Sequence, residues 1–453
     1  MSLILIKNGM VGKAEGSFRG DVLIEGEKIR EVGVCIEDER ASVVDAEGCC
    51  VVPGGVDPHT HVSLVSAGRS VSDGFEAATK AAIWGGTTTI VEHPGFAPEG
   101  SPLALPVEDA VKKGSASSYT DFGVHLVFQG TNSFEQEEVM ELVGRGHATG
   151  KVYTTYDARM KEEQIIPLMG MMERAGGLLL YHAEDDGELK RMRSDFEGKG
   201  MTGAPVWPLS RPDRCEADEV ARISALAKKA GVPSYIVHLS TELGLRRILE
   251  ARGSGGKVYA ETCPQYLCLT DDLYSGSNGM DFIMAPPLRK SEDCDALWNA
   301  LASGDIDTVG TDHCSFSRES KILFGSENVF RAPGGIPGIE TRMPILFSEG
   351  VMKGRISLER FVALTSTAPA RIMGLRDKGR IEPGADADIV IIDPEAERVL
   401  SKESLHQKVD YTPFEGMRVK GLPSHVWLRG MPMLDEGVFT ADSPSGKFVR
   451  RYL

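Results

Sequence analysis

Six side chains, five of them of a type that binds metal ions, stand at or near the ends of apolar stretches in this chain. The stretch VVPGGVDPHTHVSL carries His59 and His61, separated by one residue. The other four lie in GKVYTTY, LLLYHAE, SYIVHLS and DTVGTDH: Lys151, His182, His238 and Asp312. The set indicates a metal site, because histidine and aspartate are common ligands of divalent ions. The remaining histidines are expected to be ordinary polar groups, among them His93, His125, His147, His406 and His425.

Strand geometry explains the spacing of His59 and His61. Residues i and i+2 of a strand point to the same side, so both imidazoles can reach one ion. Lys151 does not fit this set directly, because an ammonium group has three donors and no lone pair. Either it is an ordinary surface lysine, or it reacts with CO2 to give a carbamate. A carbamate is an anion whose two oxygens could bridge two divalent ions about 3.5–4 Å apart.

These side chains need a scaffold that brings the ends of several strands together. From residue 51 onward, apolar runs alternate with segments of helical period, such as ADEVARISALAKKAG. The candidate strands are residues 51–59, 87–93, 121–128, 150–156, 178–184, 234–240, 257–263 and 307–313. Eight strand–helix units predict an α/β fold of the (β/α)8 TIM-type barrel, in which active-site residues stand at the C-terminal ends of the strands.

The two ends of the chain have a different pattern. Residues 1–52 alternate short strands and turns, and a strand pattern returns after Leu375 in DADIVIID and HVWLRGMPML. We expect residues 1–52 plus 375–453 to form a small β-sandwich with a C-terminal tail, and residues 53–374 to form the barrel. The tail, from about Ser401, is expected to pack on the barrel or on a second subunit.

Composition limits the partners and the compartment. The chain has 453 residues and a net charge of −16, which disfavours nucleic acids and anionic membranes because both attract basic surfaces. No apolar run reaches the about 18 residues that a membrane span needs. The eight cysteines form no C-x-x-C pair, and the N-terminus has no basic region before its apolar residues. We therefore expect reduced thiols, no signal peptide and a cytoplasmic protein.

Longer motifs carry a resemblance to a known family, almost from end to end. They include GVDPHTH, GKVYTTY, YHAE, IVHLS, GTDHCSF, GFEAATKAAIWGGTTTIVEH, ETCPQYL, APPLR, GGIPGIETR, FVALTSTAPARI and HQKVDYTPFEGMRVKGLP. With them the chain resembles the cyclic-amidohydrolase branch of the amidohydrolase superfamily, and within it dihydropyrimidinases and D-hydantoinases. The resemblance implies a barrel with a β-sandwich, two divalent ions (zinc first) and a homo-tetramer or dimer. It also implies hydrolysis of a small neutral cyclic ureide, a dihydropyrimidine or 5-substituted hydantoin, to an N-carbamoyl amino acid.

The resemblance assigns roles to the six side chains. One ion would be held by His59, His61, Lys151 carboxylated by CO2, and Asp312, and the other by the same Lys151, His182 and His238. Asp312 would also move a proton from the attacking water to the leaving ring nitrogen. Tyr156, just past the end of its strand, would donate to the developing oxyanion and bind substrate. The ligand set would also accept manganese, cobalt or nickel.

Two further positions are implied to hold the substrate through their main chain, namely Ala285 in MAPPLR and Gly334 in APGGIPG. Bacterial relatives often have Ser and Asn at these positions. Main-chain contacts survive such side-chain changes, although the preferred ring substituent could differ. The loop VSLVSAGRSVSD at residues 62–73 is expected to be a lid, with Arg69 facing either a substrate anion or solvent.

Other functions remain as alternatives. A dihydroorotase usually has Leu-Arg after its H-x-H, and the Arg binds the substrate carboxylate, whereas VSL follows His61 here. An allantoinase is a second alternative, because allantoin is neutral. A mononuclear deaminase usually carries H-x-x-E at the sixth strand, where this chain has LST after His238. A non-catalytic scaffold of the same fold would have lost ligands that are all present here.

Overall fold

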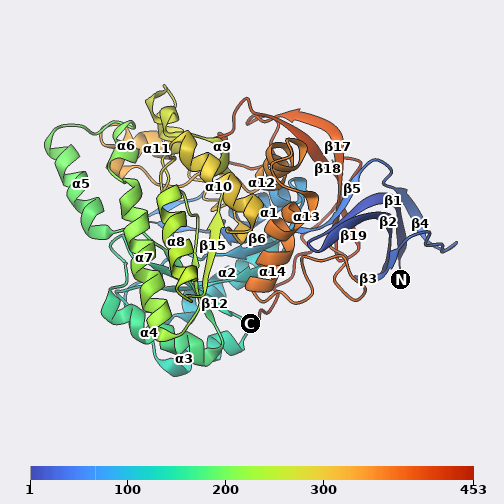
Figure 1. The fold of residues 1–453 in the computed structure, drawn as a ribbon, viewed down its shortest axis with the longest axis horizontal. Helices are drawn as coiled ribbons and strands as arrows, with labels where there is room; N and C mark the ends of the chain where they lie inside the picture. Colours follow the sequence, from blue (N-terminus) through green and yellow to red (C-terminus); the bar gives the residue numbers. More distant parts are fainter. Residues whose placement is uncertain (1, 67) are drawn as a thin grey trace.

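The computed structural model describes residues 2–66 and 68–453, and its larger part is a closed barrel of parallel strands (Figure 1). The barrel strands are β6 (Gly55–Thr60), β9 (Thr87–Glu92), β10 (Asp121–Val124) continued by β11 (Leu126–Phe128), β12 (Thr149–Tyr153), β13 (Leu178–His182), β14 (Ser234–Ile236), β15 (Val258–Thr262) and β16 (Thr308–Val309). The barrel closes beyond β16, where the Asp312 N–H donates to the His59 carbonyl over 3.0 Å. All eight expected strands are present, and the predicted barrel is confirmed.

Helices lie around the outside of the barrel. They are α1 (Gly74–Trp84), α2 (Ala104–Ser117), α3 (Gln136–Gly144), α4 (Glu162–Ala175), α5 (Asp186–Gly198), α6 (Val206–Leu209), α7 (Asp213–Ala230), α8 (Glu242–Gly253), α9 (Pro264–Cys268), α10 (Ser291–Ser303), α11 (Arg318–Gly325), α12 (Arg342–Ile345), α13 (Leu358–Val362) and α14 (Ala368–Ile372). Shorter turns are the 3-10 helices η1 (Asp271–Ser275), η2 (Gly279–Phe282) and η3 (Val329–Arg331), and the π-helices η4 (Leu346–Met352) and η5 (Ala363–Thr367). On α7, Val220, Ile223 and Ala227 are buried as its period predicts, while Ala230 at its end is exposed.

The two chain ends share a second sheet, which lies beside the barrel in Figure 1. Its strands are β1 (Leu3–Lys13), β2 (Gly16–Glu25), β3 (Lys28–Gly33), β4 (Ser42–Asp45), β5 (Cys50–Pro53), β17 (Ile389–Val399), β18 (Arg418–Leu428), β19 (Met431–Asp435) and β20 (Val438–Phe439). The N-terminal and C-terminal halves join where β5 pairs with β17. Ile6, Val22, Ile389 and Trp427 pack in one core that both ends supply, as expected of the β-sandwich. Because β5 ends at Pro53 and β6 begins at Gly55, we propose the domain division at about residue 53.

The C-terminal tail packs against the barrel, which was one of its two expected positions. Arg451 is fully buried and donates to the Thr149 hydroxyl over 2.6 Å and to the Val124 carbonyl over 2.7 Å. A short hairpin, β7 (Val65–Ser66) and β8 (Arg69–Ser70), lies in the expected lid, although Ala67 is outside the described residues. Within residues 2–66 and 68–453, no helix is both long and apolar enough to cross a bilayer.

Candidate active site

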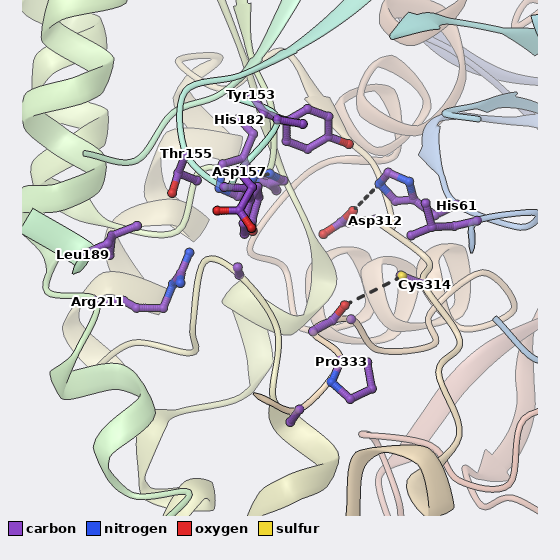
Figure 2. Close-up of a pocket in the computed structure, with 18 of the residues that line it drawn as sticks. His61, Tyr153, Thr155, Asp157, His182, Leu189, Arg211, Asp312, Cys314 and Pro333 are labelled. Carbon is purple, nitrogen blue, oxygen red and sulfur yellow. Dashed lines mark hydrogen bonds and ion pairs between the residues drawn. The ribbon is translucent and has the colours of Figure 1, made fainter. Parts of the chain in front are cut away.

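A cavity of about 580 Å³ opens at the C-terminal ends of the barrel strands. All the side chains singled out in the sequence line it: His59, His61, Lys151, Tyr156, His182, His238, Ala285, Asp312 and Gly334. In Figure 2, His61, Asp312 and Cys314 lie on one side of this cavity, and Arg211 and Leu189 lie on the other. His59 and Asp312, 253 positions apart in the chain (312 − 59), thus share one site, because parallel strands bring their C-terminal ends to the same rim.

His59, His61 and Asp312 form the tightest group of candidate ligands. One carboxylate oxygen of Asp312, Oδ1, lies 3.2 Å from His59 Nε2 and 3.1 Å from His61 Nε2. Their ligand atoms all lie within 4.8 Å of one another, as a shared ion would require. Lys151 is close by, with its Nζ 3.2 Å from His59 Nε2.

His182 and His238 form a second group on the neighbouring strands. His182 Nδ1 lies 2.8 Å from His238 Nε2, and the His238 ring stacks on the His59 ring with 5.5 Å between centroids. The two groups are therefore adjacent, and Lys151 lies in the same cavity wall.

Two buried glutamates, which the sequence analysis did not single out, orient one histidine of each group. Glu261 Oε1 lies 2.7 Å from His59 Nδ1, and Glu184 Oε2 lies 2.8 Å from His182 Nε2. A carboxylate accepts a hydrogen bond from the protonated ring nitrogen, so the other ring nitrogen keeps a free lone pair. Glu184 follows His182 by two residues in YHAE, a spacing that puts both side chains on one side of the strand and indicates the pair, whereas nothing in the segment KVYAETC links its Glu261 to His59.

The donors in the cavity fit divalent first-row ions. Burial lowers the pKa of His59, His182 and His238, so their imidazoles are neutral, which is the form that binds metal. The Nδ1 atoms of His61 and His238 are buried and have no hydrogen-bond partner among the described residues. A set of neutral imidazoles with one carboxylate suits zinc and its neighbours better than magnesium or calcium.

The backbone is strained at three of the expected site residues. Tyr156, His238 and Asp312 have φ angles of 74°, 40° and 52°, in the left-handed region that non-glycine residues rarely adopt. Such conformations cost of order 1–3 kcal/mol each and persist where the surrounding structure imposes them, often at functional sites. The strain turns the side chains that follow β12, β14 and β16 into the cavity.

Tyr156 lies beside the second histidine group, with its ring 5.2 Å from the His182 ring. Burial raises the pKa of its phenol well above the usual value, although the neighbouring Arg211 opposes the shift. The phenol is therefore protonated across the physiological range and can donate a hydrogen bond. Burial also lowers the pKa of Lys151 to about 8, against the opposing effect of the Asp312 and Glu261 charges.

The segments that contain Ala285 and Gly334 are neighbours at the mouth of the cavity. The Gly335 N–H donates to the Ile283 carbonyl over 3.0 Å. A Cβ added at Gly334 would meet only the Cα of Met284, at 3.9 Å. There is space for a side chain at this position, so glycine is not required by packing.

The other histidines are placed as follows. His125 Nε2 lies 3.0 Å from the Pro58 carbonyl and His147 Nδ1 lies 3.2 Å from the Val124 carbonyl, as expected of hydrogen-bonded polar groups. His93 differs, because in the described part of the chain neither of its ring nitrogens has a partner. It is fully buried and stacks on His125 with 3.9 Å between ring centroids.

The fold and these side chains define a class of protein: a barrel hydrolase whose candidate metal ligands stand on strand ends. The chain belongs to the amidohydrolase family, whose model matches residues 50–433. It is 41% identical to a D-phenylhydantoinase of Escherichia coli O1:K1, over 99% of this chain and 98% of the relative.

Solved structures agree with this assignment. The chain matches the crystal structure of dihydropyrimidinase from Brevibacillus agri NCHU1002 with a TM-score of 0.96 and 37% identity, covering 99% of both chains. It matches an L-hydantoinase (dihydropyrimidinase) from Arthrobacter aurescens with a TM-score of 0.92 and 28% identity, covering 100% of both. The resemblance found in the sequence is confirmed: this chain is a cyclic amidohydrolase, an enzyme that opens cyclic amides by hydrolysis, and metal dependence is general in its family.

Proposed function

We propose that this enzyme opens neutral cyclic ureides, dihydropyrimidines or 5-substituted hydantoins, to N-carbamoyl amino acids. The observation that carries the proposal is the full-length similarity to a D-phenylhydantoinase, combined with the convergence of all six candidate ligands in one cavity.

We infer that the two histidine groups, together with carboxylated Lys151, would hold two divalent ions, zinc in the first instance. His59, His61 and Asp312 would hold one ion, and His182 and His238 the other. The lowered pKa of Lys151 supports the carbamate, because only the neutral amine attacks CO2, forming an N–C bond and releasing one proton. Bound ions of this kind supply Lewis acidity and a water acidified towards neutral pH.

The chain's own residues would carry out the proton transfers. Asp312, whose side chain is partly open to the cavity, can accept a proton from the attacking water. It can return that proton to the ring nitrogen as the amide C–N bond breaks, acting first as base and then as acid. Tyr156 keeps its proton, so it can donate to the oxyanion that forms at the attacked carbonyl. Main-chain groups at Ala285 and Gly334 would hold the ureide edge.

Charge in the cavity favours neutral substrates. Arg211 is paired with Glu184, Lys190 with Asp186 and Arg193 with Glu197. Arg69 also lines the cavity, but its guanidinium is engaged by the chain itself, lying 3.8 Å over the Phe324 ring and donating over 3.2 Å to the Arg331 carbonyl. A ring carboxylate would thus lack the bidentate arginine that a dihydroorotase is expected to provide.

We further propose a cytoplasmic homo-tetramer or dimer. The cysteines of the described chain are all free, which is typical of a reducing compartment. Exposed apolar side chains on α11, Leu323 at 71% and Ile322 at 47%, are consistent with burial between subunits. Mass measurement of the purified protein in solution tests the assembly.

A hydrolysis panel tests the proposed function. Dihydrouracil, hydantoin, 5-phenylhydantoin, allantoin and dihydroorotate are compared at equal concentration, and ring opening is followed by the appearance of the N-carbamoyl product. We expect one of the first three to be the best substrate. A clear preference for allantoin or dihydroorotate would replace the proposed substrate with one of the alternatives.

A further inference from the structure

The segment that leads to Ala285 is held in place through its main-chain carbonyls. Three side chains from other parts of the chain donate to them: Tyr274 to Phe282 over 3.0 Å, Trp207 to Met284 over 2.7 Å, and Tyr266 to Pro286 over 2.8 Å. Ala285 lies among these carbonyls and lines the cavity, and within the described chain its own N–H and carbonyl have no hydrogen-bond partner. The segment thus leaves one free donor and one free acceptor, both on a residue of the cavity wall.

Lys321 makes two further bonds to the same segment. It is fully buried on α11, and its Nζ donates to the Asp281 carbonyl over 3.1 Å and to the Ile283 carbonyl over 2.9 Å. The Gly335 N–H donates to the same Ile283 carbonyl over 3.0 Å. Lys321 therefore holds the main chain two residues before Ala285, at the point where the two segments implied to bind substrate meet.

The bonds of Lys321 go to the main chain and not to an acid. Among the ion pairs of the described residues none includes Lys321, although lysine is rarely buried in full without a carboxylate partner. The Asp281 carboxylate binds Arg318 instead, one turn earlier on α11, with Arg318 Nε 2.8 Å from Oδ1. An ammonium group and a neutral amine both have at least two protons to donate, so the two bonds do not depend on the charge of Lys321. An apolar side chain would satisfy packing, so the amine is explained by the two carbonyls that it holds.

We propose that Lys321 is a positioning residue for the substrate, which fixes the main chain of Ala285 so that its N–H and carbonyl bind the edge of the ureide ring. The inference rests on the proposed function. A ring ureide carries an N–H and a C=O on neighbouring atoms of one edge, so the donor and the acceptor of a single residue can meet both. Hydrogen bonds depend on direction, and a main chain held from behind keeps that direction whichever side chain stands at the position.

This role predicts which kinetic constant changes when the amine is removed. The ring edge is bound alike before and during the attack on the carbonyl, and loss of an interaction of this kind raises KM and leaves kcat unchanged. A net hydrogen bond changes binding by about 2–10-fold, so two misdirected bonds should cost about tenfold. A residue that only stabilises the fold would lower the Tm and the amount of active enzyme, and would leave KM unchanged.

Lys321→Met is the test, because methionine keeps most of the bulk of the side chain and removes its donors. With the best substrate of the hydrolysis panel, we expect KM to rise about tenfold, kcat to stay within about threefold of the wild type, and bound metal to be unchanged. In the crystal structure of the variant, the main chain at residues 283–285 should move away from Gly335. An unchanged KM in the folded variant, or a fall in kcat that exceeds the rise in KM, would overturn the proposal. If no ring of the panel is opened, the proposed function fails, whereas an unmoved Ala285 main chain in the variant would refute this inference.

Two control variants separate this role from the loss of any lysine or of any buried hydrogen bond. Lys290→Met removes an exposed lysine of the neighbouring segment, whose Nζ lies 3.0 Å from the Asp271 carboxylate. Trp298→Phe removes a buried indole that donates to the Leu267 carbonyl over 3.0 Å, outside the cavity. Both should leave KM within about twofold of the wild type, and Trp298→Phe should lower the Tm.

A second substitution at the same position decides the matter if Lys321→Met does not fold. The amide of Lys321→Gln is one bond closer to the main chain than the lysine amine, so it cannot hold both carbonyls. KM should then rise by at least about threefold, and a folded Lys321→Gln with the wild-type KM would refute the positioning role.

Discussion

Lys151 offers the sharpest test of the proposed metal centre, because its burial should make its reaction with CO2 depend on pH in a defined way. Burial lowers the pKa of this lysine to about 8 in the metal-free protein. At pH 7 a pKa of 8 leaves about a tenth of the amine neutral, whereas an ordinary lysine with a pKa of about 10.4 leaves about 0.0004. The reactive form is therefore some hundreds of times more abundant at Lys151 than on an exposed lysine.

The sign of the pH effect follows from this pKa. The neutral amine is gained as pH rises through 8, so at fixed dissolved CO2 the carboxylation rate should rise about tenfold from pH 6 to 7 and level off above 8. Metal-free protein is exposed to ¹³C-labelled CO2, the carbamate carbon is followed by NMR, and metal uptake is measured in parallel. Lys151→Ala is the control, which should show no carbamate and lose metal, with partial recovery in short carboxylic acids.

Three results would refute this account of Lys151. The first is a carboxylation rate that is the same at pH 6 and pH 8. The second is a bare amine on Lys151 in metal-loaded protein. The third is full activity of Lys151→Ala without an added acid.

Two substitutions and one comparison of substrates test the remaining roles. Asp312→Asn removes the proton carrier and should lower kcat by about 10²–10⁴-fold; an unchanged rate in a stopped assay would exclude that role. Tyr156→Phe removes one oxyanion donor and should cost about 10²–10³-fold, while metal counted by mass spectrometry stays at the wild-type level; loss of metal would show that the phenol acts otherwise. Dihydrouracil should exceed dihydroorotate by more than about 100-fold in kcat/KM, because a buried unpaired carboxylate costs several kcal/mol and 1.36 kcal/mol is a factor of ten. Efficient turnover of dihydroorotate would instead indicate that Arg69 reaches the substrate, and Arg69→Met should then abolish it.

The barrel and its candidate ligands could be predicted from the sequence because both depend on local patterns. Apolar runs of four to eight residues alternate with helical segments, and parallel strands in such a series must place their C-terminal ends together. The spacing of His59 and His61 alone places them on one face of their strand. The other candidate ligands lie in or just after β12, β13, β14 and β16, at the same rim of the barrel. Similarly, the return of strands after Leu375 indicated a second sheet, which the pairing of β5 with β17 forms.

Two of the contacts that support the ligands could not be predicted, because each joins distant segments of the chain. Glu261 meets His59 across 202 positions of the chain, and Arg211 meets Glu184 across 27. Their residue types are common on helices and strands, so nothing in the sequence marks them as partners of histidines. The sequence also did not predict that the ring nitrogens of His93 lack hydrogen-bond partners among the described residues. A histidine at a strand end is usually hydrogen-bonded, whereas the His93 ring is stacked on His125.

The features that destabilise this site in the metal-free fold also favour the binding of ions. Three residues hold strained left-handed conformations, and the Nδ1 atoms of His61 and His238 lack partners among the described residues. The Asp312 carboxylate contacts both His59 and His61. Burial lowers the pKa of His59 and His238 and keeps these two imidazoles neutral. A divalent ion would use their free lone pairs and would pair with the Asp312 carboxylate. Because this binding occurs only in the folded barrel, the ions stabilise the fold by mass action, and removing them with a chelator should lower the Tm.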